Sequence, residues 1–385
     1  MKTDVFVKGV GALPSKPHDK PSHLLAYDAI TRCLEDADMN MNDIDAIVVS
    51  NLEWFYSSEK QRHMASQLSS TLKTHIPIIR TPLACSGGGA ALWIANKLLQ
   101  NDDFNNVIAL GVEKLMESTF NSEKILDEFM MAFEPRWEQI EGIIAPCSSA
   151  LVADAYLRKF SDTTTDDLAL IAFKNHSNGF LNPYSAFYKK KVTLEDIKNS
   201  PIICSPLRRY DCSFSCDGAA ACLLTKDKTN IKLIASSLAS DSLSVFERPD
   251  PTQWDATVIS SKEAYKEAGL EPWDIDFIEI HDAFTIVELI SYEDLGLVKK
   301  GEGAKLIRDG TVNIDGKLPM NASGGLKAKG HPVSATGLNQ VFEIVKQMRG
   351  LCDDRQLSKV NIGLAHNIGG AGGNVTCNIF RKIGG

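Results

Sequence analysis

The chain has 385 residues and a formal net charge of -8; 44% of its residues are hydrophobic and 23% are charged. This mild acidity argues against nucleic acid as the main partner, although a local basic patch could still bind a phosphorylated small molecule. A membrane protein is not expected either, because no apolar run approaches the roughly 20 residues that cross a bilayer.

The start of the chain and its cysteines indicate the compartment. The first four residues, Met-Lys-Thr-Asp, are charged and no long apolar core follows them, which is unlike a secretory signal. The nine cysteines are scattered and odd in number, so we interpret them as reduced thiols of a cytoplasmic protein. Four of them cluster at 204, 212, 216 and 222 without the Cys-x-x-Cys pairs of a zinc ribbon. Packing explains this cluster better than a metal, and we expect no metal site.

The length exceeds one typical core and predicts two domains or a duplicated domain. In the first half, apolar runs alternate with helical patterns. The predicted strands are residues 4–10, 44–50, 77–79 and 106–112, and the predicted helices are residues 22–37, 62–72 and 93–99. This alternation favours a parallel sheet covered by helices. The adjacent aromatic residues 54–56 indicate either a pocket rim or interface, or local packing.

The alternation stops between residues 113 and 215. An insertion of this length is usually a lid or a substrate-binding subdomain, and we predict helices at 150–160 and 166–178 within it. Its densest basic run, residues 189–191, is either a solvated face or a phosphate-binding patch. A buried strand at residues 219–224 then returns the chain to the sheet.

Regular alternation resumes in the second half. The predicted strands are residues 231–235, 275–280, 361–365 and 375–380, and the predicted helices are residues 251–268, 285–295 and 337–348. Cys85 opens a helix of the first half, and Gly330-His331-Pro332 opens one of the second half. We interpret this as two similar halves related by a pseudo-two-fold axis.

The stretch around Cys85 offers the first candidate for chemistry. Cys85-Ser86-Gly87-Gly88-Gly89 lies between an apolar run and a helix. A cysteine at a helix N-terminus is near unpaired N–H groups that favour thiolate, and the glycines leave room for a substrate carbonyl. The other interpretation is a buried cysteine beside a glycine-rich turn.

Histidines elsewhere favour the catalytic interpretation. His281 directly follows a predicted strand, His331 lies in a glycine-rich loop that opens a helix, and His366 begins a third such loop. The carboxyl ends of strands are where an α/β sheet places its active groups. Together with Cys85, these histidines indicate a nucleophile, a base that activates it and donors for a thioester oxygen.

These motifs, in this order, resemble those of thiolases, in particular the sterol-carrier-protein-type and archaeal acetoacetyl-CoA thiolases. The resemblance covers nearly the whole chain. It rests on Cys85 with its glycines, residues 111–118, Asp217-Gly218-Ala219-Ala220, His281-Asp282-Ala283-Phe284, residues 324–337 and Asn367-Ile368-Gly369-Gly370.

The resemblance implies a fold and an assembly. The expected fold is α/β, with five αβαβα layers, two pseudo-symmetric mixed-sheet halves and an inserted loop domain over coenzyme A. The halves would be residues 1–228, including a loop domain at about 113–215, and residues 229–385. A homodimer or homotetramer is implied. So are possible partners: a hydroxymethylglutaryl-CoA synthase and a small acyl-CoA-bridging protein of the zinc-ribbon and OB-fold type.

The resemblance also implies roles for individual residues. Cys85 would carry the acyl group as a thioester, His331 would receive its proton, and His281, where most thiolases have asparagine, would help to form an oxyanion hole. Support of the oxyanion and its loops would come from Asn321, Asn367, Gly369 and Gly370. Candidates for substrate contact are Met116, Ser323, Gly324 and His366.

The sequence departs from the family where a second acid/base is usual. Many thiolases have a cysteine where this chain has Asn367, and sterol-carrier-type relatives often have one where it has Ala283. Neither residue here can transfer a proton. The proton could instead be moved by His281, His366 or a water, or by Cys212 or Cys377. Alternatively, acyl transfer proceeds without a standard Claisen step, since the Cys85–His281–His331 set also resembles condensing enzymes that decarboxylate their substrate.

The leading hypothesis is an acyl-CoA C-acyltransferase that interconverts acetoacetyl-CoA plus CoA with two acetyl-CoA through an acyl-Cys85 thioester in a ping-pong reaction. Coenzyme A thioesters would be its substrates, and no cofactor is required. One alternative is a thiolase-like acyltransferase with a longer-chain or non-CoA acceptor. Another is a non-catalytic acyl-CoA-binding subunit of a multienzyme complex.

Overall fold

One mixed β-sheet organises the structure. The computed structural model describes residues 3–52, 59, 62–116 and 129–384, in which nine strands pair in the order β3-β2-β4-β7-β1-β8-β11-β10-β9. The first part of the sheet contains β1 (Val5–Ala12), β2 (Ala46–Ser50), β3 (Ile78–Arg80), β4 (Asn106–Glu113) and β7 (Gly218–Thr225). The second part contains β8 (Ile231–Ser240), β9 (Phe277–Glu279), β10 (Ile362–Gly369) and β11 (Asn374–Lys382). The two parts meet where β1 and β8 pair.

The sheet is not the parallel one that the alternation of strands and helices predicts. β2 is parallel to β3 and β4, and β9 is parallel to β10, but β7 runs antiparallel to both β4 and β1. The insertion leaves the sheet at Glu113 and returns at Gly218, which is the register partner of Glu113. A connection that leaves and returns at the same end gives an antiparallel pair, as in a hairpin. The insertion therefore stands at the carboxyl end of β4.

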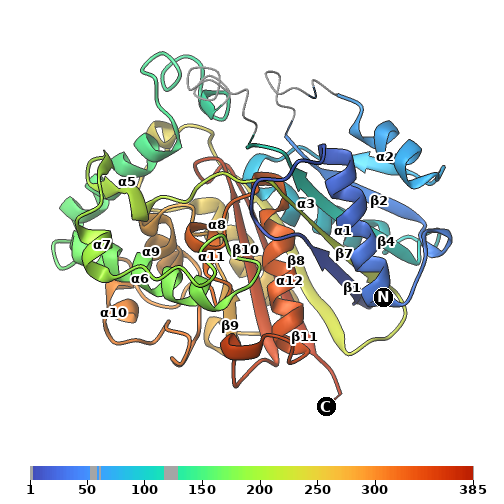
Figure 1. The fold of residues 1–385 in the computed structure, drawn as a ribbon. Helices are drawn as coiled ribbons and strands as arrows, with labels where there is room; N and C mark the ends of the chain where they lie inside the picture. Colours follow the sequence, from blue (N-terminus) through green and yellow to red (C-terminus); the bar gives the residue numbers. More distant parts are fainter. Residues whose placement is uncertain (1–2, 53–58, 60–61, 117–128, 385) are drawn as a thin grey trace.

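Helices lie outside and between the two parts of the sheet. Their bounds are α1 (Ser22–Ala37), α2 (Met64–Leu72), α3 (Gly87–Leu98), α8 (Asp255–Ala268) and α12 (Thr336–Met348). Helices α3 and α12 contact each other and strands of both parts, whereas α1 packs on the first part and α8 on the second (Figure 1). Alternate strand residues follow these layers, since Ile47 and Val49 share a core with α1 but Ala46 and Val48 share one with α12. The layers follow the expected αβαβα order.

The insertion has helices of its own, as predicted. They are α5 (Ala145–Lys159), α6 (Thr165–Leu181) and α7 (Leu194–Lys198), followed by the hairpin of β5 (Ile202–Cys204) and β6 (Leu207–Arg208). Helix α5 begins earlier than predicted because Pro146 is tolerated in a first helical turn. In Figure 1 these helices are green. Helices α5 and α6 pack against α9 (Thr285–Asp294), α6 also packs against α10 (Gly303–Arg308), and α7 packs against α6.

Two sequence features that could mark binding surfaces, residues 54–56 and 189–191, are not part of the described helices and strands. The aromatic residues 54–56 lie outside the described residues. The basic residues 189–191 are exposed. Among the helices that the structure describes, none is both long and apolar enough to cross a membrane.

Candidate active site

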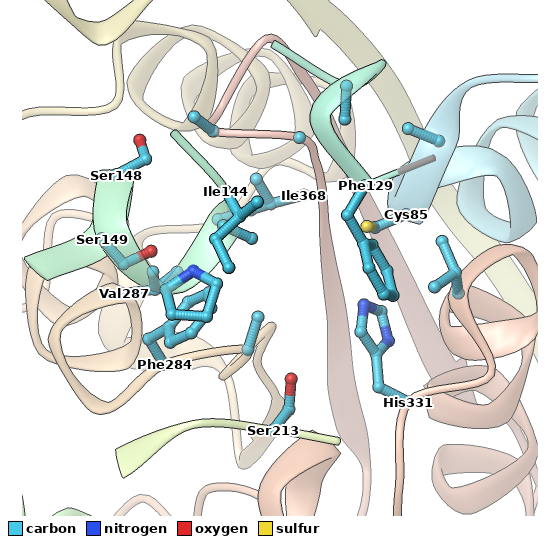
Figure 2. Close-up of a pocket in the computed structure, with 18 of the residues that line it drawn as sticks. Cys85, Phe129, Ile144, Ser148, Ser149, Ser213, Phe284, Val287, His331 and Ile368 are labelled. Atoms are coloured by element: carbon cyan, nitrogen blue, oxygen red, sulfur yellow. The ribbon is translucent and has the colours of Figure 1, made fainter. Parts of the chain in front are cut away.

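A cavity of about 530 Å³ lies between the insertion and the carboxyl ends of the strands. Cys85, His281 and His331 all line it, as the sequence predicts. Most of its wall is apolar, and the apolar side chains that line it include Phe129, Phe133, Ile144, Trp254, Phe284 and Val287. Figure 2 shows Cys85 and His331 on one side of this cavity and Ser148, Ser149 and Phe284 on the other.

Cys85 lies in a tight turn, residues Ala84–Ser86, immediately before α3. The turn is sharp because Ala84 has the left-handed backbone conformation, with φ of 45°, which is unusual for a residue with a side chain. Burial raises the pKa of the Cys85 thiol to about 11, against the lowering effect of hydrogen bonds from the backbone N–H groups of Gly370 and Cys85 itself. Proximity to the helix N-terminus does not outweigh burial here, and the resting group is a thiol.

The glycines after Cys85 have a different role from the predicted one. A Cβ on Gly87 would lie 2.0 Å from Ser50 Oγ, and one on Gly89 would lie 2.0 Å from Thr376 Oγ1. A Cβ on Gly88 would lie 2.8 Å from the backbone oxygen of Ser334. The glycines therefore allow the first turn of α3 to approach its neighbours closely, and the approach of a substrate is not what requires them.

His331 has a neutral imidazole and is held by hydrogen bonds of its backbone and its ring. Its backbone N–H donates to Phe214 O over 3.0 Å, and its ring Nδ1 lies 2.6 Å from Thr336 Oγ1. The Thr336 hydroxyl donates its own proton to Pro332 O over 3.3 Å, so it accepts from Nδ1–H. Burial lowers the pKa of His331 to about 3. The unprotonated Nε2 is then the ring nitrogen that can accept a proton, and the role of His331 as base stays a prediction.

His281 lies at the end of β9 with its ring centroid 5.4 Å from that of His331. Burial, then the nearby His331, lowers the pKa of His281 well below its ordinary value. Its Nδ1 lies 3.2 Å from Nδ2 of Asn367, which also donates to Cys85 O over 2.9 Å. Asn367 and Gly370 from the end of β10 are thus brought to Cys85, as predicted. Gly369 is close as well, since a Cβ there would lie 2.6 Å from Ser86 Oγ.

Four predicted substrate contacts lie elsewhere in the structure; within the described part of the cavity wall, Met116, Ser323, Gly324 and His366 are all absent. His366 Nε2 lies 3.1 Å from Thr257 Oγ1, because neighbours on a strand point to opposite faces and Asn367 takes the face of the site.

The other three have structural partners. Ser323 N–H donates to Glu279 over 3.0 Å, a Cβ on Gly324 would lie 2.6 Å from Gly179, and the Met116 N–H donates to Asp217 over 2.7 Å. Asn321, predicted as support, accepts from Ile280 N–H over 2.8 Å and so fixes the residue before His281.

A buried charged network behind His281 was missed from the sequence. Lys327 Nζ lies 2.9 Å from Asp282 Oδ2 and donates to Asp282 O over 2.9 Å, and Lys174 Nζ lies 2.6 Å from Glu288 Oε1. Asn175 donates to both carboxylates. Two ammonium groups thus balance two carboxylates directly beside the His281 loop. Only the position of Asp282 next to His281 could have indicated this, because lysines are rarely buried.

Comparison with known proteins places these features in context. Residues 9–228 match the family model described as thiolase, N-terminal domain, and residues 237–382 match the model described as thiolase C-terminal domain-like. The chain is 38% identical to an acetyl-CoA acetyltransferase of Methanothermobacter thermautotrophicus, over 91% of each chain. It is 32% identical to sterol carrier protein 2 of Bos taurus, over 99% of this chain and 73% of that one.

A solved structure shares the fold. The Ltp2-ChsH2(DUF35) aldolase aligns with a TM-score of 0.82 over 98% of this chain and 98% of its own, at 21% identity.

Proposed function

This chain belongs to the thiolase family, and on that premise we propose that it catalyses the reaction of acetoacetyl-CoA with CoA to give two acetyl-CoA, and its reverse. The observation that carries the proposal is the meeting of Cys85, His281 and His331 in one cavity beneath the insertion. The acetyl-CoA acetyltransferase similarity over most of the chain supports the acyl group and the coenzyme A thioester substrates.

The first half-reaction is transfer of an acyl group to Cys85. Because the Cys85 thiol and the His331 imidazole are both neutral at rest, the thiol must lose its proton as it reacts. Cys85 Sγ attacks the 3-oxo carbonyl of acetoacetyl-CoA while His331 Nε2 takes the thiol proton. The N–H groups of Cys85 and Gly370, which contact the sulfur, are placed to stabilise the oxyanion that forms beside it. In the cleavage direction, the bond between the former 3-oxo carbon and the α-carbon of the thioester then breaks, and acetyl-Cys85 remains.

The α-carbon leaves as an enolate of acetyl-CoA, and its thioester oxygen carries the developing charge. His281 donates to that oxygen. Of the candidates for the second acid/base, Cys377 contacts Ser260 and Cys212 contacts Arg208 O, and neither is in the described cavity wall. His331 has by then received the thiol proton, and we assign to it the protonation of the enolate. CoA next attacks the carbonyl of acetyl-Cys85 and gives up its thiol proton to His331. The bond between the acetyl group and Cys85 Sγ then breaks, acetyl-CoA leaves, and the Cys85 thiolate takes the proton back from His331.

Intact-protein mass spectrometry tests this proposal. Brief incubation with acetyl-CoA is expected to add one acetyl group to the wild type and none to Cys85→Ser, and the wild type is expected to consume acetoacetyl-CoA when CoA is present. An adduct without cleavage would assign Cys85 to another acceptor. Absence of an adduct would instead favour a non-catalytic acyl-CoA-binding subunit.

The apolar cavity favours a second candidate, a thiolase of longer 3-oxoacyl-CoA substrates. A volume of about 530 Å³ with an aromatic and aliphatic wall exceeds what an acetyl group alone can fill. Thiolysis rates along a series from four to ten acyl carbons test this candidate. A rate constant that rises with chain length supports it, and activity confined to four carbons excludes it.

We also propose a homodimer or homotetramer in the cytoplasm. Strand β3 is at the sheet edge and Ile79 on it is 40% exposed, and such an edge can pair with a second copy. A small bridging protein is a further proposed partner, since the similar aldolase structure is described by two components, Ltp2 and ChsH2(DUF35). Light scattering of the purified chain, alone and with such a protein, tests both.

We propose the domain division at residues 228 and 229. It separates the strands β1–β7 from β8–β11, and the two family models match on either side of it.

A further inference from the structure

The Asn367 side chain lies between the nucleophile and His281. It is 1% exposed and makes three contacts. Its Nδ2 donates to Cys85 O over 2.9 Å and lies 3.2 Å from His281 Nδ1, and its Oδ1 accepts from Gly89 N–H over 3.3 Å. One amide thus connects the turn of Cys85, the first turn of α3 and the histidine of the neighbouring strand.

The backbone partners fix which way this amide points. The opposite orientation would place Oδ1 against the oxygen of Cys85 and Nδ2 against the N–H of Gly89, so both contacts would become repulsive. Nδ2 therefore faces His281 Nδ1. It has two protons, one for Cys85 O and one for the imidazole.

A donor at Nδ1 determines the tautomer of His281. Burial keeps the imidazole neutral by lowering its pKa, and a neutral imidazole has one N–H. Because Nδ1 accepts from Asn367, the proton is on Nε2, and His281 lines the cavity where an oxygen of the substrate would need a donor. His331 is the opposite case, since Thr336 accepts from its Nδ1–H and leaves Nε2 as an acceptor.

We propose that Asn367 is a positioning residue that holds His281 in the Nε2–H tautomer, so that one histidine of the site donates while the other accepts. The inference rests on the proposed thiolase function for its kinetic consequence. It explains what a non-titrating amide does where many thiolases have a cysteine. The proposal also predicts that the two half-reactions depend differently on Asn367. Acetylation of Cys85 uses backbone N–H donors, whereas formation of the enolate needs the Nε2–H of His281.

The tautomer can be measured without any activity. Long-range proton–nitrogen spectra of protein labelled with ¹⁵N-histidine, assigned with His281→Asn, are expected to show His281 with Nδ1 unprotonated and Nε2 protonated. In Asn367→Asp the carboxylate can only accept, so the proton is expected on Nδ1. A wild-type His281 with protonated Nδ1, or an Asn367→Asp spectrum without that change, would overturn the inference.

Measurements of kcat for cleavage and of the rate of Cys85 acetylation test the kinetic consequence of the tautomer. Asn367→Asp is expected to lower kcat for acetoacetyl-CoA cleavage by about 100-fold, the usual effect of losing one oxyanion donor, and to lower the rate of Cys85 acetylation by acetyl-CoA much less. Asn378→Asp on β11 is the control for a buried carboxylate, because Asn378 is equally buried and contacts Ser236 away from the cavity. Thermal unfolding of both variants monitors the fold.

A double-mutant comparison separates positioning from support of the turn. The side-chain amide of an asparagine at 281 always has N–H donors, whatever residue 367 is. In the His281→Asn background, Asn367→Asp is therefore expected to lower kcat for cleavage by less than about 5-fold. An equal loss in both backgrounds would mean that Asn367 acts only on the Cys85 turn. If the wild type neither becomes acetylated nor cleaves the substrate, the proposed function fails, whereas the spectra still decide the tautomer.

Discussion

At the level of single residues, burial determines the protonation states of Cys85 and His331. The Cys85 thiol and the His331 imidazole are each kept neutral, the first by a raised pKa and the second by a lowered one. A resting thiolate, which the position of Cys85 at a helix N-terminus favours from the sequence, is therefore not the state of this site. In the proposed reaction, the thiol proton of Cys85 would therefore move to His331 only once a substrate is bound.

This state predicts how Cys85 reacts with an alkylating reagent. With a pKa of about 11, the thiolate fraction rises about tenfold per pH unit across the neutral range. The rate of carbamidomethylation at Cys85, followed by peptide mass spectrometry, is expected to keep rising between pH 6 and pH 9. A plateau below pH 8 would contradict the prediction and indicate an ion pair.

The Thr336 hydroxyl is the partner that makes His331 a base. Thr336→Val removes the acceptor for Nδ1–H while preserving side-chain shape, so the ring loses its fixed tautomer. We expect kcat for cleavage to fall at least about 10-fold, since a wrong tautomer removes the base. Thr336→Ser, which keeps the hydroxyl, is the control and should remain within a few-fold of the wild type.

At the level of the elements, the ion pair of Asp282 with Lys327 holds the loop after β9 in place. Asp282 also accepts from the N–H of Leu326 over 2.6 Å, so the loop and the short helix α11 (Gly325–Ala328) are held together by one carboxylate. Burial raises the pKa of Asp282, and Lys327 opposes that effect. The loop that carries His281 therefore depends on a lysine distant in sequence.

Removal of that lysine should destabilise the chain strongly. Lys327→Met leaves Asp282 and Glu288 with one buried cation, and breaking such a pair typically costs about 3–5 kcal/mol in the free energy of unfolding. The control is Lys305→Met, whose pair with Glu302 is exposed and screened by solvent, so its loss should change the free energy of unfolding little. Urea unfolding measures both. A loss for Lys327→Met as small as that of the control would refute a structural role for the network.

Buried histidines make the stability of the whole molecule sensitive to acid. Burial lowers the pKa of His176, His331 and His366 to about 3 each, and both ring nitrogens of His176 lack hydrogen-bond partners among aromatic neighbours such as Phe187 and Tyr210. The unfolded chain binds these protons near pH 6.5, but the folded chain does not.

The sign of the effect follows from this difference. Stability is complete above about pH 6.5 and falls as the pH decreases toward 3, by up to about 1.4 kcal/mol per pH unit for each histidine. Urea unfolding between pH 7.5 and pH 5 tests it. His176→Phe should reduce the slope of stability against pH, and an unchanged slope would show that His176 does not contribute.

The sequence by itself determined the order of the elements and pointed to three candidate reactive side chains, which the structure brings together in one cavity. Apolar periodicity located the strands and helices, since burial of alternate or every third to fourth residue depends on local spacing. Cys85, His281 and His331 were found because each follows a strand or opens a helix, and those ends meet at one edge of a sheet.

Only the tertiary structure decided direction, distance and protonation. Strand β7 is antiparallel because of where a long insertion returns, which no local pattern records. The His366 ring contacts Thr257, whereas the Asn367 side chain contacts Cys85 O and His281, because a strand that pairs on both sides fixes which face each residue takes. The neutral Cys85 and His331 and the buried lysines depend on how completely distant segments exclude water from them, and that exclusion exists only once the chain is folded.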